Sequence, residues 1–208
     1  MTINIELNQK SIQEAKKQLL QLKKTIPKLQ QDFLMNVAHW ITDRANTYID
    51  NSDIGISVKS LIKTSWEYQQ LPNGIQVINS ANTTKKIDRR GTEATVPTAI
   101  LVEFGVGIIG SGDPHPQANA ENYEYNIPNR AKFLGGYWSF EQSLSDLDLP
   151  LDSVDYEKST NGFVFLTQGA KGVWYAYNAI QDAKMELTRP NGGEIGALWE
   201  KAKRKYIK

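Results

Sequence analysis

An apolar stripe in the first quarter of the chain constrains the fold more than any other feature. Apolar side chains recur at steps of three and four residues, at Ile12, Ala15, Leu19, Leu22, Ile26, Leu29, Phe33, Val37, Trp40 or Ile41, and Tyr48. Ser11 and Glu14 fit a capping box, so we expect a helix that begins near residues 8–11 and continues to Asp50. Such a helix would be about 60 Å long.

Pro27 interrupts this stripe, because proline lacks a backbone donor and disfavours helix at the residue before it. We expect either a kink or a brief break there, and the continuity of the stripe favours the kink. Two placements of the helix stay open. It folds back on the chain's own sheet, or it projects onto a neighbouring subunit.

A β-hairpin is predicted next. Ile62, Thr64, Trp66 and Tyr68 alternate with polar residues, and Pro72-Asn73-Gly74 supplies a turn before residues 75–79. The following segment, Ala99 to Phe104, fits a short helix capped by Gly105 or a buried strand, and its periodicity does not decide between them.

Glycines at 105, 107 and 110 match the spacing of a dinucleotide-binding fingerprint. That fingerprint requires a helix after its third glycine, but Pro114 and Pro116 oppose a helix there. We therefore expect turn glycines and no nucleotide cofactor.

The rest of the chain divides into an irregular segment and a helical end. Residues 110–160 are rich in turn formers and then acidic, yet aromatic enough to favour partial order, with strands near Lys132 to Phe140 and Gly162 to Thr167. Packing of these aromatic residues is favoured over stacking on bases or sugars. Helices are expected at Val173 to Leu187 and Ile195 to Ile207, separated at Asn191-Gly192-Gly193.

These elements predict an α+β fold with a long kinked N-terminal helix, an antiparallel β-sheet and C-terminal helices. We expect one domain, in which residues 1–52 hold the long helix and 53–109 the sheet and central motif. Residues 110–160 would form an irregular segment rich in acidic and aromatic residues, and residues 161–208 would form a strand and the C-terminal helices.

Composition excludes several classes of function. The 208 residues carry a net charge of +1 and no cysteine, so neither a strong overall field nor thiolate chemistry is expected. The N-terminus lacks a leader pattern and no apolar run reaches membrane-spanning length, so we expect a soluble, unsecreted protein without membrane contact.

Catalytic and metal-binding patterns are scarce. His39 reads as a helix-surface residue and His115 as part of a turn, and neither has a neighbouring ligand at metal-binding spacing. Asp146, Asp148 and Asp152 could hold a hard cation, but they lack an EF-hand pattern, so a solvated loop is the simpler interpretation. We expect no enzyme activity, no cofactor and no metal.

The segment Val96-Pro97-Thr98-Ala99-Ile100-Leu101-Val102-Glu103-Phe104-Gly105-Val106-Gly107 resembles the central motif of a family of tailed-phage head-tail joining proteins. These are also called neck, tail-component or minor capsid proteins. In that family an apolar segment ends in Glu-Phe-Gly-x-Gly, after a long N-terminal helix and before a C-terminal helical region. This chain has Val106 where the family usually has threonine, and a longer segment at 110–160.

The resemblance implies a structural virion protein that forms a homo-oligomeric ring. Its expected partners are phage neck and tail proteins, and the DNA that passes through the ring is a further candidate partner. It would assemble in the host cytoplasm and remain in the virion. Glu103, Phe104, Gly105 and Gly107 would be the assembly or structural motif. Glu103 either lies beside the core with a partner that sets subunit register, or emerges at the surface beside a turn. Gly105 and Gly107 fit positions of positive φ or close backbone approach.

Two alternative functions remain. The first is a nucleic-acid-binding module, whose phosphate contacts would be Lys85, Lys86, Arg89, Arg90, Lys201, Lys203, Arg204 and Lys205. The second and weaker one is a nucleotide-dependent enzyme.

Overall fold

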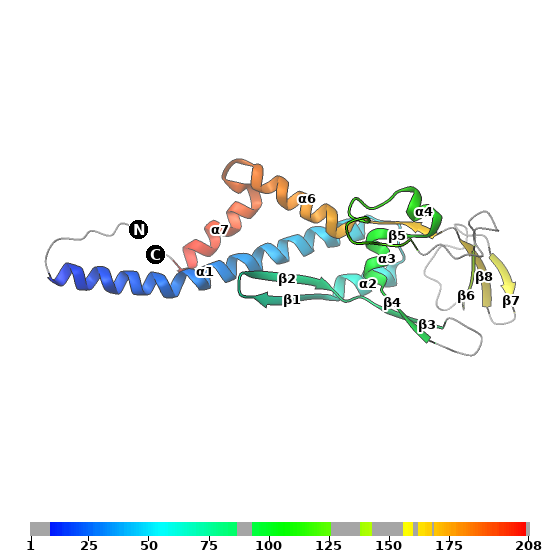
Figure 1. Ribbon diagram of the computed structural model, residues 1–208, viewed down its shortest axis with the longest axis horizontal. Helices are drawn as coiled ribbons and strands as arrows, with labels where there is room; N and C mark the ends of the chain where they lie inside the picture. Colours follow the sequence, from blue (N-terminus) through cyan, green and yellow to red (C-terminus); the bar gives the residue numbers. More distant parts are fainter. Residues whose placement is uncertain are drawn as a thin grey trace. The chain divides into compact units, whose positions relative to one another are not determined.

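The structure is a computed structural model that describes residues 9–86, 93–125, 138–142, 156–159, 162–167 and 169–206 (Figure 1). It confirms the α+β class. The helices are α1 Gln9–Asp50, α2 Ile56–Thr64, α3 Thr98–Phe104, α4 Gly107–Gly112, α6 Tyr175–Thr188 and α7 Gly193–Tyr206. The strands are β1 Trp66–Leu71, β2 Gly74–Asn79, β3 Thr83–Lys86, β4 Glu93–Val96, β5 Gly105–Val106, β6 Trp138–Gln142, β7 Tyr156–Ser159, β8 Gly162–Thr167 and β9 Gly169–Lys171.

The chain divides into two compact units. Unit 1 comprises Met1–Asp43, Tyr68–Val77 and Ile180–Lys208, and unit 2 comprises Arg44–Glu67 and Ile78–Ala179. Both α1 and α6 therefore contribute residues to each unit.

The predicted long helix is present as α1, which runs unbroken through Pro27 (Figure 1). The sequence left open a kink or a brief break at Pro27, and the continuous helix excludes the break. Because α1 begins at Gln9, Ser11 lies inside the helix and not at its N-cap position, so the expected capping box is wrong.

Unit 1 packs the hairpin and the C-terminal helix against α1. The hairpin is tied to the helix by a hydrogen bond of 2.7 Å between the hydroxyls of Thr42 and Tyr68. Helix α7 packs Trp199 edge-on against Phe33, with ring centroids 5.3 Å apart. Figure 1 shows the hairpin lying along α1.

The apolar stripe of α1 is only partly covered. Leu29 is 2% exposed, whereas Ile12, Leu19 and Ile26 are 42%, 52% and 51% exposed. The stripe therefore has a packed section and, toward the N-terminus, an open row of large apolar side chains.

Unit 2 corrects the expected start of the hairpin. Ile62 and Thr64 belong to α2 and not to a strand. Val58, Leu61 and Ile62 recur at helical spacing, and Ile62 is fully buried. The Thr64 hydroxyl donates to the carbonyl of Ser60, 2.9 Å away, as helical threonines do.

The strands form four small sheets, where a single antiparallel sheet was expected. β1 pairs with β2, β3 with β4, β5 with β9, and β8 lies between β6 and β7. The last three sheets are antiparallel. The expected strand at residues 162–167 is confirmed as β8. Of the strand expected near residues 132–140, Trp138 to Phe140 belong to β6, and residues 132–137 lie outside the described part.

The start of the expected irregular excursion is in fact ordered and packed. Helix α4 already occupies Gly107–Gly112, so Gly110 lies inside a helix that ends before Pro114. His115 and Ala118 are buried in the turns that follow. The expectation of turn glycines is therefore wrong for Gly110, since the prolines only follow the end of this short helix. The apolar and aromatic side chains here find partners within unit 2.

The C-terminal region follows the predicted pattern. A single 3₁₀ turn at Pro190–Gly192 separates α6 from α7. The break falls where Asn191, Gly192 and Gly193 adopt φ values of 58°, 75° and 54°, which end a right-handed helix. Among the described residues, none of the helices combines the length and apolar character needed to cross a membrane.

Candidate functional site

Helix α3 brings the Glu-Phe-Gly-x-Gly motif into the interior of unit 2. The helix ends at Gly105, whose φ of 86° lies in the left-handed region and whose N–H donates to the carbonyl of Leu101. This resolves the open choice for Ala99 to Phe104 in favour of the short helix capped by Gly105.

The Glu103 carboxylate is the centre of the site. Glu103 is 7% exposed, and its Oε2 and Oε1 accept the backbone N–H groups of Ala176 and Tyr177, each at 2.9 Å. These are amides of the first turn of α6, which have no partner within the helix. A carboxylate at this position also meets the positive end of the helix dipole. Glu103 therefore caps α6 from a distant part of the chain.

His115 completes the shell of donors around Glu103. Its Nε2 lies 3.1 Å from Glu103 Oε1, and its Nδ1 accepts the Gln117 N–H at 3.0 Å. Because Nδ1 accepts, the proton lies on Nε2 and points at the carboxylate. Both ring nitrogens are engaged and His115 is 3% exposed, so this ring has no nitrogen with which to take a proton from a substrate. We call Glu103, His115 and the amides of Ala176 and Tyr177 the Glu103 clasp.

Aromatic rings surround the clasp. The Phe104 ring lies 4.3 Å from the His115 ring and 4.6 Å from the Tyr123 ring, measured between centroids. Tyr177 and Trp174 meet His115 edge-on at 5.2 and 5.7 Å. These contacts exclude water from the hydrogen bonds of the clasp, which strengthens them.

Two tyrosines attach the turns after α4 to the motif. The Tyr125 hydroxyl accepts the His115 N–H at 2.8 Å, and the Tyr123 hydroxyl donates to the carbonyl of Gly105. Burial raises the pKa of the Tyr123 phenol, with Tyr125 contributing, so Tyr123 stays a donor. Of the aromatic residues that the sequence favoured as packed against the main sheet, Tyr123 and Tyr125 pack instead against the motif and against each other, and Phe133 and Tyr137 lie outside the described residues.

The motif glycines permit close approach of two backbones. Strand β5 pairs with β9, with Gly105 opposite Lys171, and Gly107 forms a bridge with Gly169. A Cβ on Gly105 would lie 2.5 Å from the nitrogen of Gly172, which is too close for any side chain. Gly107 also has a positive φ, of 70°. Both glycines occupy the kind of position that the sequence indicated.

The start of α6 carries two further features. Burial raises the pKa of the Tyr175 phenol, with the Glu103 charge adding to the effect, and this hydroxyl donates to the carbonyl of Ala99. Trp174 adopts a φ of 54°, which is unusual for a bulky residue, and its buried Nε1 has no hydrogen-bond partner. Tight packing around the clasp holds this conformation.

The sequence indicated Glu103, Phe104, Gly105 and Gly107 but missed His115 as a partner of Glu103. His115 does lie in a turn, as expected, but it is buried. The only signal for such a partner in the sequence was chemical, because a carboxylate buried among apolar residues needs hydrogen-bond donors. His39, by contrast, is exposed on α1 as expected, and its ring lies 4.5 Å from that of Tyr68.

The residues considered for phosphate contact belong to both units, with Lys85 and Lys86 in unit 2 and the residues of α7 in unit 1. On α7, Lys203 pairs with Glu200 and Lys205 with Asp32, while Lys201 and Arg204 are exposed. Lys85 and Lys86 lie in β3, where only the backbone is described, and Arg89 and Arg90 lie outside the described residues. Asp146, Asp148 and Asp152 also lie outside them.

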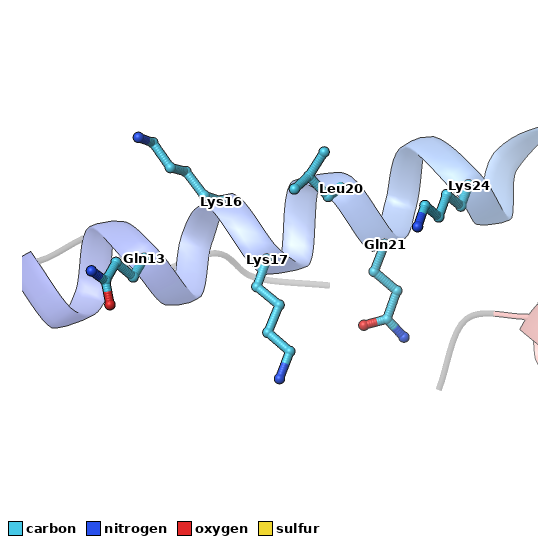
Figure 2. A pocket seen from close by; sticks show the side chains of 6 residues that line it. All are labelled: Gln13, Lys16, Lys17, Leu20, Gln21 and Lys24. Carbon is cyan, nitrogen blue, oxygen red and sulfur yellow. The ribbon is translucent and has the colours of Figure 1, made fainter.

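No metal cluster marks a second site in the described part of the chain. There, no group of three or more histidines, cysteines or carboxylates has metal-binding geometry. Figure 2 shows a shallow hollow whose lining comes from α1 alone, so one helix surface borders it. Its lining residues are Gln13, Lys16, Lys17, Leu20, Gln21 and Lys24.

No protein-family model, no curated protein and no solved structure matches this chain. The function proposed below therefore rests on the residues and the geometry of the chain itself.

Proposed function

We propose that this chain is a structural protein of tailed-phage particles. It joins the head to the tail or completes the upper end of the tail, as one copy in a ring. It assembles in the host cytoplasm, remains in the virion, and contacts further copies of itself and other neck and tail proteins. The completed ring would surround the path of the passing DNA.

The observation that carries this proposal is the open apolar row on α1. Ile12, Leu19 and Ile26 are about half exposed, although they continue the stripe that buries Leu29. A row of large apolar side chains that a chain leaves in water is typical of a surface that another protein covers. An assembly subunit requires such surfaces.

The Glu103 clasp supports the same proposal. The segment that resembles the head-tail joining motif forms a rigid internal structure in which Glu103, Phe104 and the two glycines all have partners. An internal structure held by these hydrogen bonds suits a subunit that acts by position. Joining a head to a tail requires no chemical step.

Deletion of the gene from a phage or prophage that carries it tests the proposal. We expect lysates of the deletion to contain filled heads and complete tails that remain separate, as counted by electron microscopy. Supplying the protein in trans should restore joined, infectious particles. Normal particles from the deletion would overturn the neck function.

A further inference from the structure

Lysines are concentrated along one side of α1 near its beginning. Residues 15–31 contain five lysines and no acidic residue, whereas the whole chain has a net charge of only +1. The positive charge is therefore a local property of this section, all of which belongs to unit 1. We call the five residues the lysine stripe: Lys16, Lys17, Lys23, Lys24 and Lys28.

The lysine stripe consists of two rows along the helix. At about 100° per residue, Lys17, Lys24 and Lys28 fall into one row. Lys16 and Lys23 fall into a second row beside it. Figure 2 shows Lys16 and Lys17 extending away from the helix in different directions. From Lys16 to Lys28 the stripe is about 18 Å long at the helical rise per residue.

The five lysines lie away from the packed side of α1. Ala15 and Leu29, on the opposite side of the helix, are 6% and 2% exposed, whereas all five lysines are exposed. In the part of the chain that the structure describes, none of the five pairs with a carboxylate, unlike Lys205 of α7, which pairs with Asp32. The described residues therefore leave the charge of the stripe without a counter-charge.

We propose that the lysine stripe binds the phosphate backbone of duplex DNA. Such DNA carries one negative charge per 1.7 Å of its axis, or roughly ten over the length of the stripe, so it presents more phosphates than the stripe has lysines. A protein surface normally intersperses both signs of charge and offers no such line. The contact is independent of base sequence, because phosphates carry no sequence information. It deepens the proposed function, and its place on the DNA path of the ring rests on that function.

An anionic lipid surface is the other partner that a basic helix can bind. Binding of that kind buries the apolar face of the helix among the lipids. On α1, Ala15 and Leu29 of the apolar face are already buried, so this face is not free to enter a bilayer as a whole. Phosphates that approach from the lysine side require no such freedom, and DNA is therefore the better match.

The salt dependence of DNA binding tests the contact. Fluorescence anisotropy would measure the affinity of the purified full-length protein for a labelled mixed-sequence duplex of about 30 base pairs over a series of salt concentrations. With five lysines on phosphates, the slope of log affinity against log salt should be about −4.5. The variant with Lys16→Gln, Lys17→Gln, Lys23→Gln and Lys24→Gln should have a slope of about −1 and bind at least about tenfold more weakly at low salt. Glutamine retains the helix, because its helix propensity is close to that of lysine.

Matched variants remove two charges from one helix at a time. Lys17→Gln with Lys24→Gln should reduce the magnitude of the slope by about 1.8. Lys201→Gln with Arg204→Gln removes two exposed charges from α7 and should leave the slope unchanged. Circular dichroism melting verifies that each variant is folded. Vesicles made of equal parts of phosphatidylglycerol and phosphatidylcholine serve as the lipid probe.

Four results would overturn the DNA contact. They are wild-type protein that does not bind the duplex at low salt, a four-lysine variant with the slope of wild type, a slope that changes only in the α7 variant, and tighter binding to the vesicles than to DNA. If the contact fails while gene deletion still yields separate heads and tails, the neck function stands without it. If deletion has no effect but DNA binding depends on the stripe, the contact stands and the neck function fails.

Discussion

Three donors from two separate parts of the chain converge on the Glu103 carboxylate. The His115 Nε2–H and the N–H groups of Ala176 and Tyr177 all point at it, in a shell of aromatic rings. Removing the acid would leave these buried and partly buried donors without their acceptor, which costs more than the hydrogen bonds themselves contribute. At the scale of single residues, Glu103 thus connects α3, the turns after α4 and the start of α6.

Glu103→Ala should lower the free energy of unfolding by about 2–4 kcal/mol, because the buried His115 Nε2–H and the partly buried amides of Ala176 and Tyr177 lose their acceptor at about 1 kcal/mol each. Urea unfolding followed by tryptophan fluorescence measures this. Glu121→Ala, at an exposed position in the nearby turns, is the control and should change stability by less than about 0.5 kcal/mol. Equal stability of the two variants would show that the clasp does not hold unit 2 together.

Gly105→Ala should destabilise the protein by about 1–3 kcal/mol, since the new Cβ meets the nitrogen of Gly172 at 2.5 Å and φ is positive. Gly74→Ala is the matched control, because a Cβ there has nothing within 4 Å. Chemical denaturation of both variants gives the comparison. If Gly105→Ala were as stable as Gly74→Ala, the close approach of β5 and β9 would be wrong.

At the scale of elements, α1 has two sections along its length. Its packed section contacts the hairpin and α7, and its N-terminal section carries the exposed row Ile12, Leu19 and Ile26. The apolar period in the sequence predicted the helix but not this division, because a period shows which residues share a face and not whether anything covers it. Whether a residue of α1 is buried depends on its contacts with α7 and with the hairpin, which are remote from it in sequence.

Leu29→Asp should destabilise the protein by several kcal/mol, because a carboxylate without a partner would be buried where Leu29 is 2% exposed. Leu19→Asp should change the melting temperature little, since Leu19 is 52% exposed, but should weaken self-association. Thermal melting and sedimentation on both variants separate folding from assembly. Equal melting temperatures would contradict the division of α1 into packed and open sections.

The contact between α1 and α7 should give the protein part of its acid sensitivity. Hydrogen bonds from Lys205 and Tyr206 lower the pKa of Asp32, so this contribution to stability is present above the carboxyl's unfolded pKa, near 4, and disappears as the pH falls through the lowered value. Asp32→Asn should therefore be slightly less stable than wild type at pH 7, by about 1 kcal/mol or less, and should lose less stability below pH 4. Urea unfolding at a series of pH values measures both slopes. Identical slopes would show that this exposed pair contributes nothing.

At the scale of the whole molecule, the sequence predicts several of the helices and strands well, but it predicts the contacts between them poorly. Helices α1, α6 and α7 follow from apolar periods and from the turn at residues 190–193. The assignment of Ile62 and Thr64 to a strand was wrong because alternation over so few residues also fits the last turn of a short helix, which here is the end of α2. The link from Glu103 to His115 and α6 was not predictable, since it depends on how α3, the turns and α6 pack in three dimensions.

Locating the protein in purified particles tests the central claim most directly. A phage carrying this gene with a C-terminal epitope would be labelled with gold-conjugated antibody and viewed by electron microscopy. We predict label at one place on each particle, where the head meets the tail or at the tail's upper end, and none elsewhere. Purified infectious particles that contain no copy of the protein would contradict the claim that it is a structural part of the virion.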